Sequence, residues 1–338
     1  MTVGKTRARR IALATVAFAT IAGVSASAAS ASGTVNFVAY AVPQPAFDKI
    51  IPLFQKSAIG KGTQFTTSYG ASGDQSRAVA NGQPADFVNF SVAPDINRLV
   101  TAGLVNPSYE SELPNRAVPA ATPVVIGVRK GNPLKIKNWD DIVKPGVKIV
   151  TADFKTSGAA KWNALAAWGQ AKARGKSNEE SQAFLVNFYK NVVVQAKSGR
   201  EVTQAFAAGQ GDVAIQYEFE AQAAQREGVQ QDYVIPTPTM LIQSPVATIQ
   251  TSANAATAKK FGKFLYTPEA QAAYGSVGFI PYLKSYKKKG KTIAIKTTAR
   301  PFKGRLFNIN FFGGWTKADV DFFGPKGYAT RARAEAGK

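Results

Sequence analysis

The chain has 338 residues, 45% of them hydrophobic, and this length is sufficient for two ordinary hydrophobic cores. It has no cysteine and no histidine, which excludes disulfides, thiol nucleophiles, Ser-His-Asp triads and zinc sites that use either residue. Lysine and arginine together number 42 against 21 acidic residues, so the formal net charge is +21 and the partners to consider are small anions, membrane surfaces and nucleic acid.

The N-terminal segment has the layout of a cleavable export signal. An apolar run from 11 to 24, short for a membrane span, follows four cations, Lys5, Arg7, Arg9 and Arg10. Small residues then continue to position 31. We therefore predict that residues 1–31 are a signal peptide and that the mature chain, with a net charge of about +17, is periplasmic.

After the signal, runs of β-forming residues alternate with helical patterns, which is typical of an α/β layer fold. The predicted strands span 35–41, 64–69, 86–90, 123–129, 148–151, 192–195, 213–216, 233–235 and 246–250. The predicted helices span 46–55, 74–81, 94–102, 138–143, 159–173, 178–191, 201–208, 218–227, 255–265 and 268–276.

Prolines gather in two places, near 118–122 and 236–239, that we interpret as crossings between two lobes. This interpretation assigns residues 34–120 and 239–338 to lobe one, which is discontinuous, and residues 121–238 to lobe two. A cleft between two lobes is a favoured ligand site, and closure of the lobes around a hinge would bury the ligand.

Three times a strand ends in small hydroxyl or glycine residues and is followed at once by a helix, at 66–73, 156–160 and 197–200. A helix N-terminus carries unpaired N–H groups and about half a positive charge. Three such ends that point at one place would form a cage for an anion, to which Ser72 and Ser157 can add hydroxyl donors. From the residues alone we interpret the chain as a binder of a small oxyanion.

Plainer roles for the same residues stay open. Ser72 and Ser157 can be N-caps of their helices, which is the commonest role of serine at such a place. Gly158 and Gly199 can be tight-turn glycines, and Tyr217 can be an aromatic residue of the core or the rim.

Other charged residues are interpreted as solvated. The nine cations between 284 and 305 predict an exposed loop, and no nucleic-acid partner is predicted. The acidic pairs Asp140-Asp141 and Glu218/Glu220 are predicted to be solvated faces or caps, because their spacing does not show that they converge as a catalytic pair would. We predict neither a cofactor nor a metal.

Several longer motifs surround the three junctions. They are SYGASGDQ (68–75), VRKGNP (128–133) with WDD (139–141) and KPGV (144–147), SGAAKWN (157–163) with AAWG (166–169), GDV (211–213) with Glu218 and Glu220, LYTPEAQ (265–271) and FGGW (312–315). As a set, and over nearly the whole mature chain, they resemble the periplasmic sulfate- and thiosulfate-binding proteins of ABC importers.

This resemblance implies a two-lobed periplasmic-binding-protein fold of type II, which holds dehydrated sulfate in its cleft with uncharged donors. By position, it implies that Ser72 and Ser157 donate their hydroxyls and that Gly158, Ala159 and Gly199 donate their backbone N–H groups. Sulfate is fully ionised at neutral pH and only accepts hydrogen bonds. A site with donors alone therefore discriminates against a protonated phosphate, whose proton would find no acceptor.

Three positions differ from the family pattern. Ala41 stands where the family has an aspartate whose backbone N–H reaches the anion, so the resemblance implies that Ala41 keeps this backbone donor but lacks the carboxylate. Tyr217 stands where a tryptophan donates its indole N–H, and a phenol differs because it can also accept. Lys161 replaces an arginine. These differences leave the ligand open between sulfate or thiosulfate and another oxyanion such as molybdate, phosphate or an organosulfonate.

The resemblance predicts a binding protein that is a monomer, performs no chemistry, and delivers sulfate to the membrane permease subunits of an ABC importer. Two other classes stay open. A secreted enzyme acting on sulfate or phosphate esters would need a nucleophile and a base without histidine or cysteine. A basic surface-adhesion or scaffold protein would need neither a closed site nor a ligand.

Overall fold

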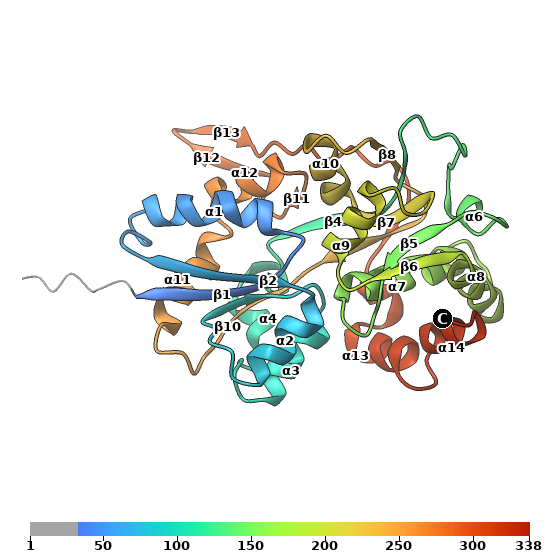
Figure 1. The fold of residues 1–338 in the computed structure, drawn as a ribbon. Helices are drawn as coiled ribbons and strands as arrows, with labels where there is room; N and C mark the ends of the chain where they lie inside the picture. Colours follow the sequence, from blue (N-terminus) through green and yellow to red (C-terminus); the bar gives the residue numbers. More distant parts are fainter. Residues whose placement is uncertain (1–32) are drawn as a thin grey trace, which may run out of the picture. The chain divides into compact units, whose positions relative to one another are not determined.

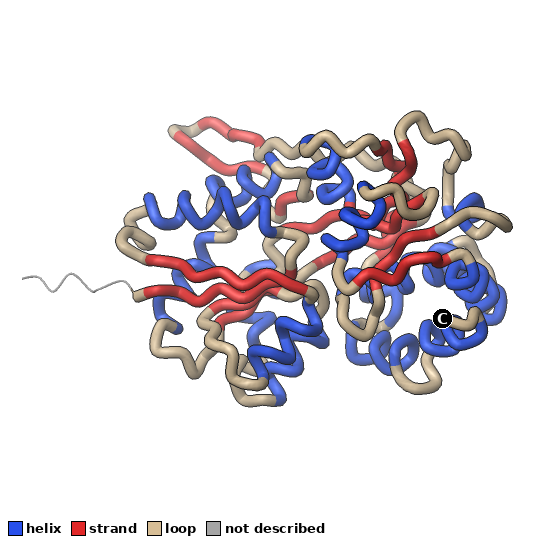
Figure 2. The backbone as a smooth tube through the Cα atoms, in the orientation of Figure 1, coloured by secondary structure: helices blue, strands red, loops and turns tan. Residues whose placement is uncertain are grey.

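Two β-sheets with helices packed around them organise the described part of the chain, which is residues 33–338 of a computed structural model (Figure 1). The predicted signal peptide at 1–31 lies outside the described residues. Strands and helices alternate along most of the chain (Figure 2), and the predicted α/β class is confirmed. Among the described residues, no helix combines the length and the apolar character that a membrane span requires.

The first sheet has the strand order β10-β3-β1-β2. β1 (Thr34–Tyr40) runs parallel to β2 (Gln64–Gly70) and β3 (Phe87–Asn89), so the carboxyl ends of these three strands share one edge. β10 (Val246–Thr248) runs antiparallel to β3. The associated helices are α1 (Gln44–Lys56), α2 (Ser72–Ala80), α3 (Ala93–Thr101), α11 (Ala255–Phe264) and α12 (Pro268–Ser276).

An aromatic cluster holds the first sheet to its helices. Phe261 of α11 has its ring centroid within 6.4 Å of five other rings, those of Phe37, Phe47, Phe54, Phe65 and Phe87. α1 contributes two of these rings because its phenylalanines recur at helical spacing on one buried face. This packing fixes the strand ends from which α2 and α3 begin.

The second sheet has the strand order β14-β9-β4-β7-β5-β6, and β8 and β11 also pair with β4. β5 runs parallel to both β6 and β7, so their carboxyl ends lie at one edge. The strands are β4 (Ala120–Arg129), β5 (Ile149–Ala152), β6 (Val192–Ala196), β7 (Val213–Tyr217), β8 (Gln231–Val234), β9 (Thr239–Gln243), β11 (Ile280–Pro281) and β14 (Leu306–Phe307). The helices around it are α6 (Trp139–Ile142), α7 (Gly158–Ala173), α8 (Asn178–Lys190), α9 (Gly199–Ala207) and α10 (Glu218–Arg226).

The C-terminal segment packs on the second sheet's helices. Its elements are η1 (Ile309–Phe312), α13 (Trp315–Ala318), η2 (Asp319–Phe323) and α14 (Tyr328–Glu335). Trp168 of α7 lies against three rings of this segment, those of Phe312, Phe322 and Tyr328. The division of the chain into two lobes stays a proposal. These contacts favour a division in which residues 306–338 belong to lobe two rather than lobe one.

The predicted strands and helices are all present, with their ends shifted by at most three residues. The structure adds elements that the sequence patterns did not predict. They are α4 (Tyr109–Glu112), α5 (Pro114–Ala117), β9, β11, β14, the four C-terminal elements, and a hairpin of β12 (Ser285–Lys288) and β13 (Lys291–Ala294). The prediction of a loop over 284–305 is therefore wrong for residues 285–294, although the segment is exposed as expected.

Candidate functional site

The N-termini of α2, α7 and α9 are in contact. The backbone N–H of Gly73 in α2 donates to the carbonyl of Thr156, just before α7, at 2.9 Å. A Cβ built on Gly199, the first residue of α9, would lie 3.2 Å from the Cβ of Ala159 in α7. The three strand-to-helix junctions singled out in the sequence therefore lie at one place, where the parallel strands of both sheets end.

The start of α7 presents hydrogen-bond donors that have no partner. Gly158 and Ala159 are buried, and within residues 33–338 no group accepts from their backbone N–H groups. The N–H of Gly199, half-buried at the start of α9, also has no acceptor in the described part of the chain. Buried N–H groups are normally satisfied, and a helix N-terminus attracts negative charge, so this arrangement is suited to an anion.

Ser157 adds a hydroxyl to these N–H groups. Ser157 is 3% exposed and is the N-cap residue of α7, as the capping interpretation predicted for its position, but its side chain forms neither the capping bond nor another hydrogen bond with the described residues. Its hydroxyl is therefore available as a donor.

Ser72 lies in the same region but its hydroxyl is already bonded. It donates to Asp95 Oδ2 at 2.6 Å and accepts from the N–H of Ser91 at 2.9 Å. Ser72 does not cap α2, whose N-cap residue is Ala71, so a capping role is wrong for Ser72. Donation from Ser72 to an anion requires exchange of its bond to Asp95.

Ser91, which the sequence patterns did not single out, links several of the predicted residues. Its hydroxyl lies 2.8 Å from the hydroxyl of Tyr217, and its carbonyl accepts from the indole N–H of Trp162 at 2.9 Å. A Cβ on Gly158 would lie 2.7 Å from the Cβ of Ser91, so only glycine permits this approach. Ser91 lies two residues after the end of β3, and a serine at the carboxyl end of a parallel strand was the signal that could have identified it.

Tyr217 is 1% exposed, so it is a core residue rather than a rim aromatic. Burial, with a smaller contribution from Tyr40, raises the pKa of Tyr217 well above its usual range, and the phenol is therefore neutral. Tyr217 can donate only one hydrogen bond, and the geometry with Ser91 leaves open which of the two hydroxyls is the donor.

Ala41 differs from the other predicted donors. Its backbone N–H donates to the carbonyl of Gly70 at 2.9 Å, continuing the pairing of β1 with β2. The N–H is thus committed to the first sheet in this structure. The neighbouring Val42 does approach the site, since its Cγ2 would lie 3.0 Å from a Cβ on Gly199.

A buried carboxylate lies beside the donors. Glu220 is 1% exposed, and its Oε2 would lie 3.7 Å from a Cβ on Gly199. Its Oε1 has no hydrogen-bond partner in the part of the chain that the structure describes, and it is 3.5 Å from Nε of Arg200. Burial raises the pKa of Glu220 to about 7, against the opposing effect of Arg200.

The acidic pairs have mixed outcomes. The prediction that Glu218 and Glu220 lie on a solvated face is wrong, because both are buried. Glu218 is a structural acceptor for the N–H of Arg300 at 2.8 Å and the hydroxyl of Tyr233 at 3.1 Å. Asp141 takes part in the capping box of α6 with Asn138, as the capping interpretation predicted.

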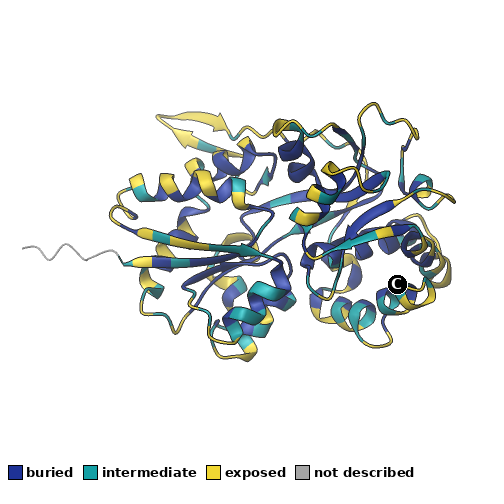
Figure 3. Ribbon diagram, viewed as in Figure 1, coloured by how far each residue is buried: buried dark blue, intermediate teal, exposed yellow. Residues whose placement is uncertain are grey.

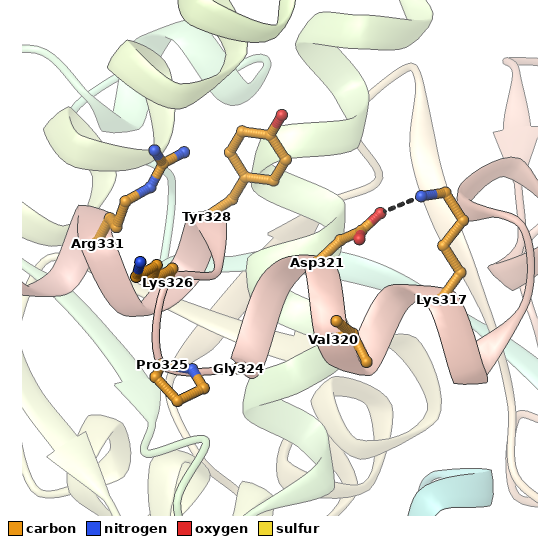
Figure 4. Close-up of a pocket in the computed structure, with 8 residues that line it drawn as sticks. All are labelled: Lys317, Val320, Asp321, Gly324, Pro325, Lys326, Tyr328 and Arg331. Carbon is orange, nitrogen blue, oxygen red and sulfur yellow. Dashed lines mark hydrogen bonds and ion pairs between the residues drawn. The ribbon is translucent and has the colours of Figure 1, made fainter.

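A separate surface cavity of about 720 Å³ lies along the C-terminal helices (Figure 4). Its lining includes the ion pair of Lys317 with Asp321, together with Lys326, Tyr328 and Arg331. None of the residues that were predicted as ligand donors lines it. Within the described residues, no group of three or more acidic side chains is placed to hold a metal ion.

Comparisons with known proteins identify a family. Residues 35–280 match the model described as bacterial extracellular solute-binding protein. The chain is 40% identical to the sulfate-binding protein of Synechococcus elongatus, over 97% of this chain and 96% of that protein. It is 31% identical to the thiosulfate-binding protein of Pseudomonas aeruginosa, over 88% of this chain and 91% of that protein. The solved structure of the sulfate-binding protein SubI from Mycobacterium tuberculosis superposes with a TM-score of 0.79 at 38% identity, covering 86% of this chain and 99% of that one.

Proposed function

The chain belongs to the bacterial extracellular solute-binding proteins, and on that premise we propose that it captures sulfate between its two lobes for import by an ABC transporter. One observation supports the proposed site above all others. The N–H groups of the buried residues Gly158 and Ala159 and the hydroxyl of Ser157 have no acceptor among the described residues. An anion placed at the start of α7 would satisfy all three.

The chemistry of these donors suits a dianion that carries no proton. Hydrogen bonds to an ionised acceptor are about twice as strong as neutral ones, and the half charge of a helix N-terminus adds to them. Four donors, from Ser157, Gly158, Ala159 and Gly199, can therefore replace much of the hydration that sulfate loses. We propose that Ser72 and Tyr217 complete the site through Ser91, after exchange of their present bonds.

The finer parts of this function are also proposals. Contacts between the two lobes at Gly73 and Thr156, and at Ser91 and Gly158, support a site that is closed in this structure. We propose that the protein is a periplasmic monomer, that it performs no chemistry on its ligand, and that permease subunits in the membrane receive the anion when the lobes open.

Calorimetric titration of the protein with sulfate, thiosulfate, molybdate and phosphate tests the proposal, together with two serine variants. Ser157→Ala should weaken sulfate binding by roughly tenfold or more, because a hydrogen bond to a charged group contributes about 1.5–3 kcal/mol. The matched control is Ser181→Ala, also a fully buried serine, whose hydroxyl donates to the carbonyl of Ser177 far from the site. It should lower the thermal midpoint and leave affinity unchanged. Absence of heat with sulfate and thiosulfate at micromolar protein would contradict the proposal.

Phosphate is the second candidate because of Glu220. A carboxylate next to the donors can accept the proton that HPO4²⁻ carries, which a site with donors alone cannot do. Since the pKa of Glu220 is about 7, phosphate should compete with bound sulfate better at pH 8 than at pH 6 if this candidate is correct. Equal competition at the two pH values, or none, favours sulfate.

A further inference from the structure

The hairpin of β12 and β13 is separate from both sheets. Its two strands pair only with each other, and it projects beyond α12 and α1 in Figure 1. Seven of its eight strand residues are exposed, as the yellow colour of the hairpin in Figure 3 indicates. Isolated two-stranded hairpins are marginally stable, so the sequence at its tip matters for its energy.

The tip of the hairpin concentrates positive charge. Lys287, Lys288, Lys289 and Lys291 lie within five positions, and the sequence has no acidic residue between Glu269 and Asp319. Within the described residues none of these four lysines forms an ion pair. Their charges are therefore available to an external partner.

Two features of the hairpin oppose its own stability. Lys288 lies directly opposite Lys291 across the strands, and like charges at opposed positions repel. Lys289 has φ of 47° in the turn, a conformation that non-glycine residues rarely adopt. Neutral polar residues at positions 288, 289 and 291 would be equally soluble and would avoid this repulsion. The arrangement therefore indicates a use for the charge.

The inner side of the hairpin keeps it in a defined position. Tyr286 and Ile293 are opposed on one face and line a cavity of about 760 Å³ that α12 borders. The N–H of Ile295 donates to the carbonyl of Lys284, and the N–H of Thr298 donates to Gly275. Lys288 lines the same cavity, and Lys291 opposite it lies on the same face of the hairpin, whereas Lys287 lies on the other face. The lysines are thus carried by an element whose position is supported.

The kind of charge indicates the kind of partner. The segment 284–305 has seven lysines and two arginines. Lysine is depleted at protein–protein interfaces, whereas arginine is enriched there. Lysine is a compact, hydrated point charge that suits diffuse attraction to a charged surface. Clusters of four to eight basic residues beside a transmembrane helix or on an amphipathic helix bind anionic lipid headgroups, and the hairpin presents a cluster of comparable size on a β-element. We propose that the β12–β13 hairpin binds the surface of membranes that contain anionic phospholipid.

This inference goes beyond the proposed function and does not depend on which anion the site takes. Such binding would concentrate the protein at the membrane without involving the ligand site. The attraction should weaken with added salt, because surface charges are screened over about 10 Å at 0.1 M ionic strength.

Vesicle flotation tests the proposal on residues 32–338, the compact unit that contains every described element. The probes are phosphatidylcholine vesicles with and without about 30% phosphatidylglycerol, at roughly 0.05 M and 0.5 M salt. The unaltered protein should float only with the anionic vesicles and only at low salt. The hairpin variant, with Lys287, Lys288, Lys289 and Lys291 changed to glutamine, should bind at least tenfold more weakly.

The matched control changes four exposed lysines elsewhere, Lys56, Lys61, Lys137 and Lys190, to glutamine; none of them forms an ion pair with another residue of 33–338. It has the same net charge as the hairpin variant and should bind like the unaltered protein. Thermal unfolding of both variants checks that each is folded. Equal loss of binding in both variants, no flotation of the unaltered protein, or stronger binding to polyglutamate than to anionic vesicles would each overturn the proposal.

Discussion

At the scale of single residues, the proposed anion site depends on the polar groups at the start of α7 and around Ser91. Ser157 and Ser72 look equivalent in the sequence, since each precedes or begins a helix. They differ in the structure because the Ser157 hydroxyl has no partner within the described residues, whereas Ser72 is bonded to both Asp95 and Ser91. The two serines should therefore respond differently to substitution.

Ser72→Ala should lower both stability and sulfate affinity. The substitution leaves a buried carboxylate oxygen of Asp95 and the N–H of Ser91 without their partner, which costs about 1–3 kcal/mol for each group that remains unsatisfied. Urea denaturation of the ligand-free protein measures this loss, and Ser157→Ala is the comparison. Equal stability of the two variants would show that the bonds of Ser72 contribute nothing.

Glu220 should make stability depend on pH. Its pKa in the folded protein is raised from 4.5 to about 7, mainly by burial, so the folded state binds its proton more tightly than the unfolded state does. The stabilising contribution is complete below pH 4.5 and is lost as pH rises through 7, and amounts to on the order of 3 kcal/mol. Unfolding free energies of Glu220→Gln and the unaltered protein should converge at about pH 4 and differ at pH 8, where the variant is the more stable. A constant difference from pH 5 to pH 8 would contradict this assignment.

At the scale of elements, the site depends on how closely α7 approaches the end of β3. Gly158 is the first residue of α7, and its lack of a side chain allows the helix to lie against Ser91 and Val92. The donors of α7 and the residues of the first sheet meet only because of this approach. The dipole of the 16-residue helix α7 then acts at the same place.

Gly158→Ala should reduce sulfate affinity while leaving α7 intact. The new Cβ would lie 2.7 Å from the Cβ of Ser91 and 3.2 Å from Cγ1 of Val92, so the two lobes would have to separate. Alanine is a better helix former than glycine by about 1 kcal/mol, so the helix itself is not weakened. Calorimetry should show at least a tenfold loss of affinity, and circular dichroism should show unchanged helix content. Unaltered affinity would mean that the contact with Ser91 does not matter for binding.

The sequence predicted the helices and strands that surround the site because each junction combines a β-forming run with a small residue before a helix. It also singled out Ser157, Gly158, Ala159 and Gly199 as donors, and the structure places these residues close together, although their binding of an anion stays a prediction. It did not single out Ser91: a serine after a predicted strand was a usable signal, but the role of this residue depends on the pairing of β3 with β1, which no local pattern shows. Neither could it predict the burial of Glu220, since alternating acids near a helix start usually lie on a solvated face.

The hairpin was missed for a different reason. Lysine and serine have low strand propensity, so the pattern of residues 284–294 predicted a loop. The turn at Lys289 and Gly290, with φ of 47° and 76°, is what joins the two strands. A lysine-glycine pair is a weaker turn signal than asparagine-glycine, and alternation between apolar and polar residues is short here. The C-terminal helices were also missed because their local sequence signal is weak. They are stabilised by packing against Trp168, a contact that no local pattern shows.

At the scale of the whole molecule, ligand binding couples to stability through the contacts between lobes. If sulfate binds only the folded protein, a concentration about 100 times Kd should stabilise it by about 2.7 kcal/mol. Differential scanning fluorimetry should therefore show a rise in the thermal midpoint with sulfate that chloride at equal ionic strength does not produce. The rise should be much smaller for Ser157→Ala at the same sulfate concentration. A rise of the same size with both salts would indicate a general salt effect.

The most direct test of the account is a crystal structure of the protein with selenate, which has the shape and charge of sulfate and gives an anomalous signal from selenium. The account predicts one strong anomalous peak at the start of α7. Its oxygens should lie about 2.7–3.2 Å from Ser157 Oγ and from the backbone nitrogens of Gly158, Ala159 and Gly199. A well-occupied peak elsewhere, with these four groups still unpartnered, would contradict the claim that they hold the anion.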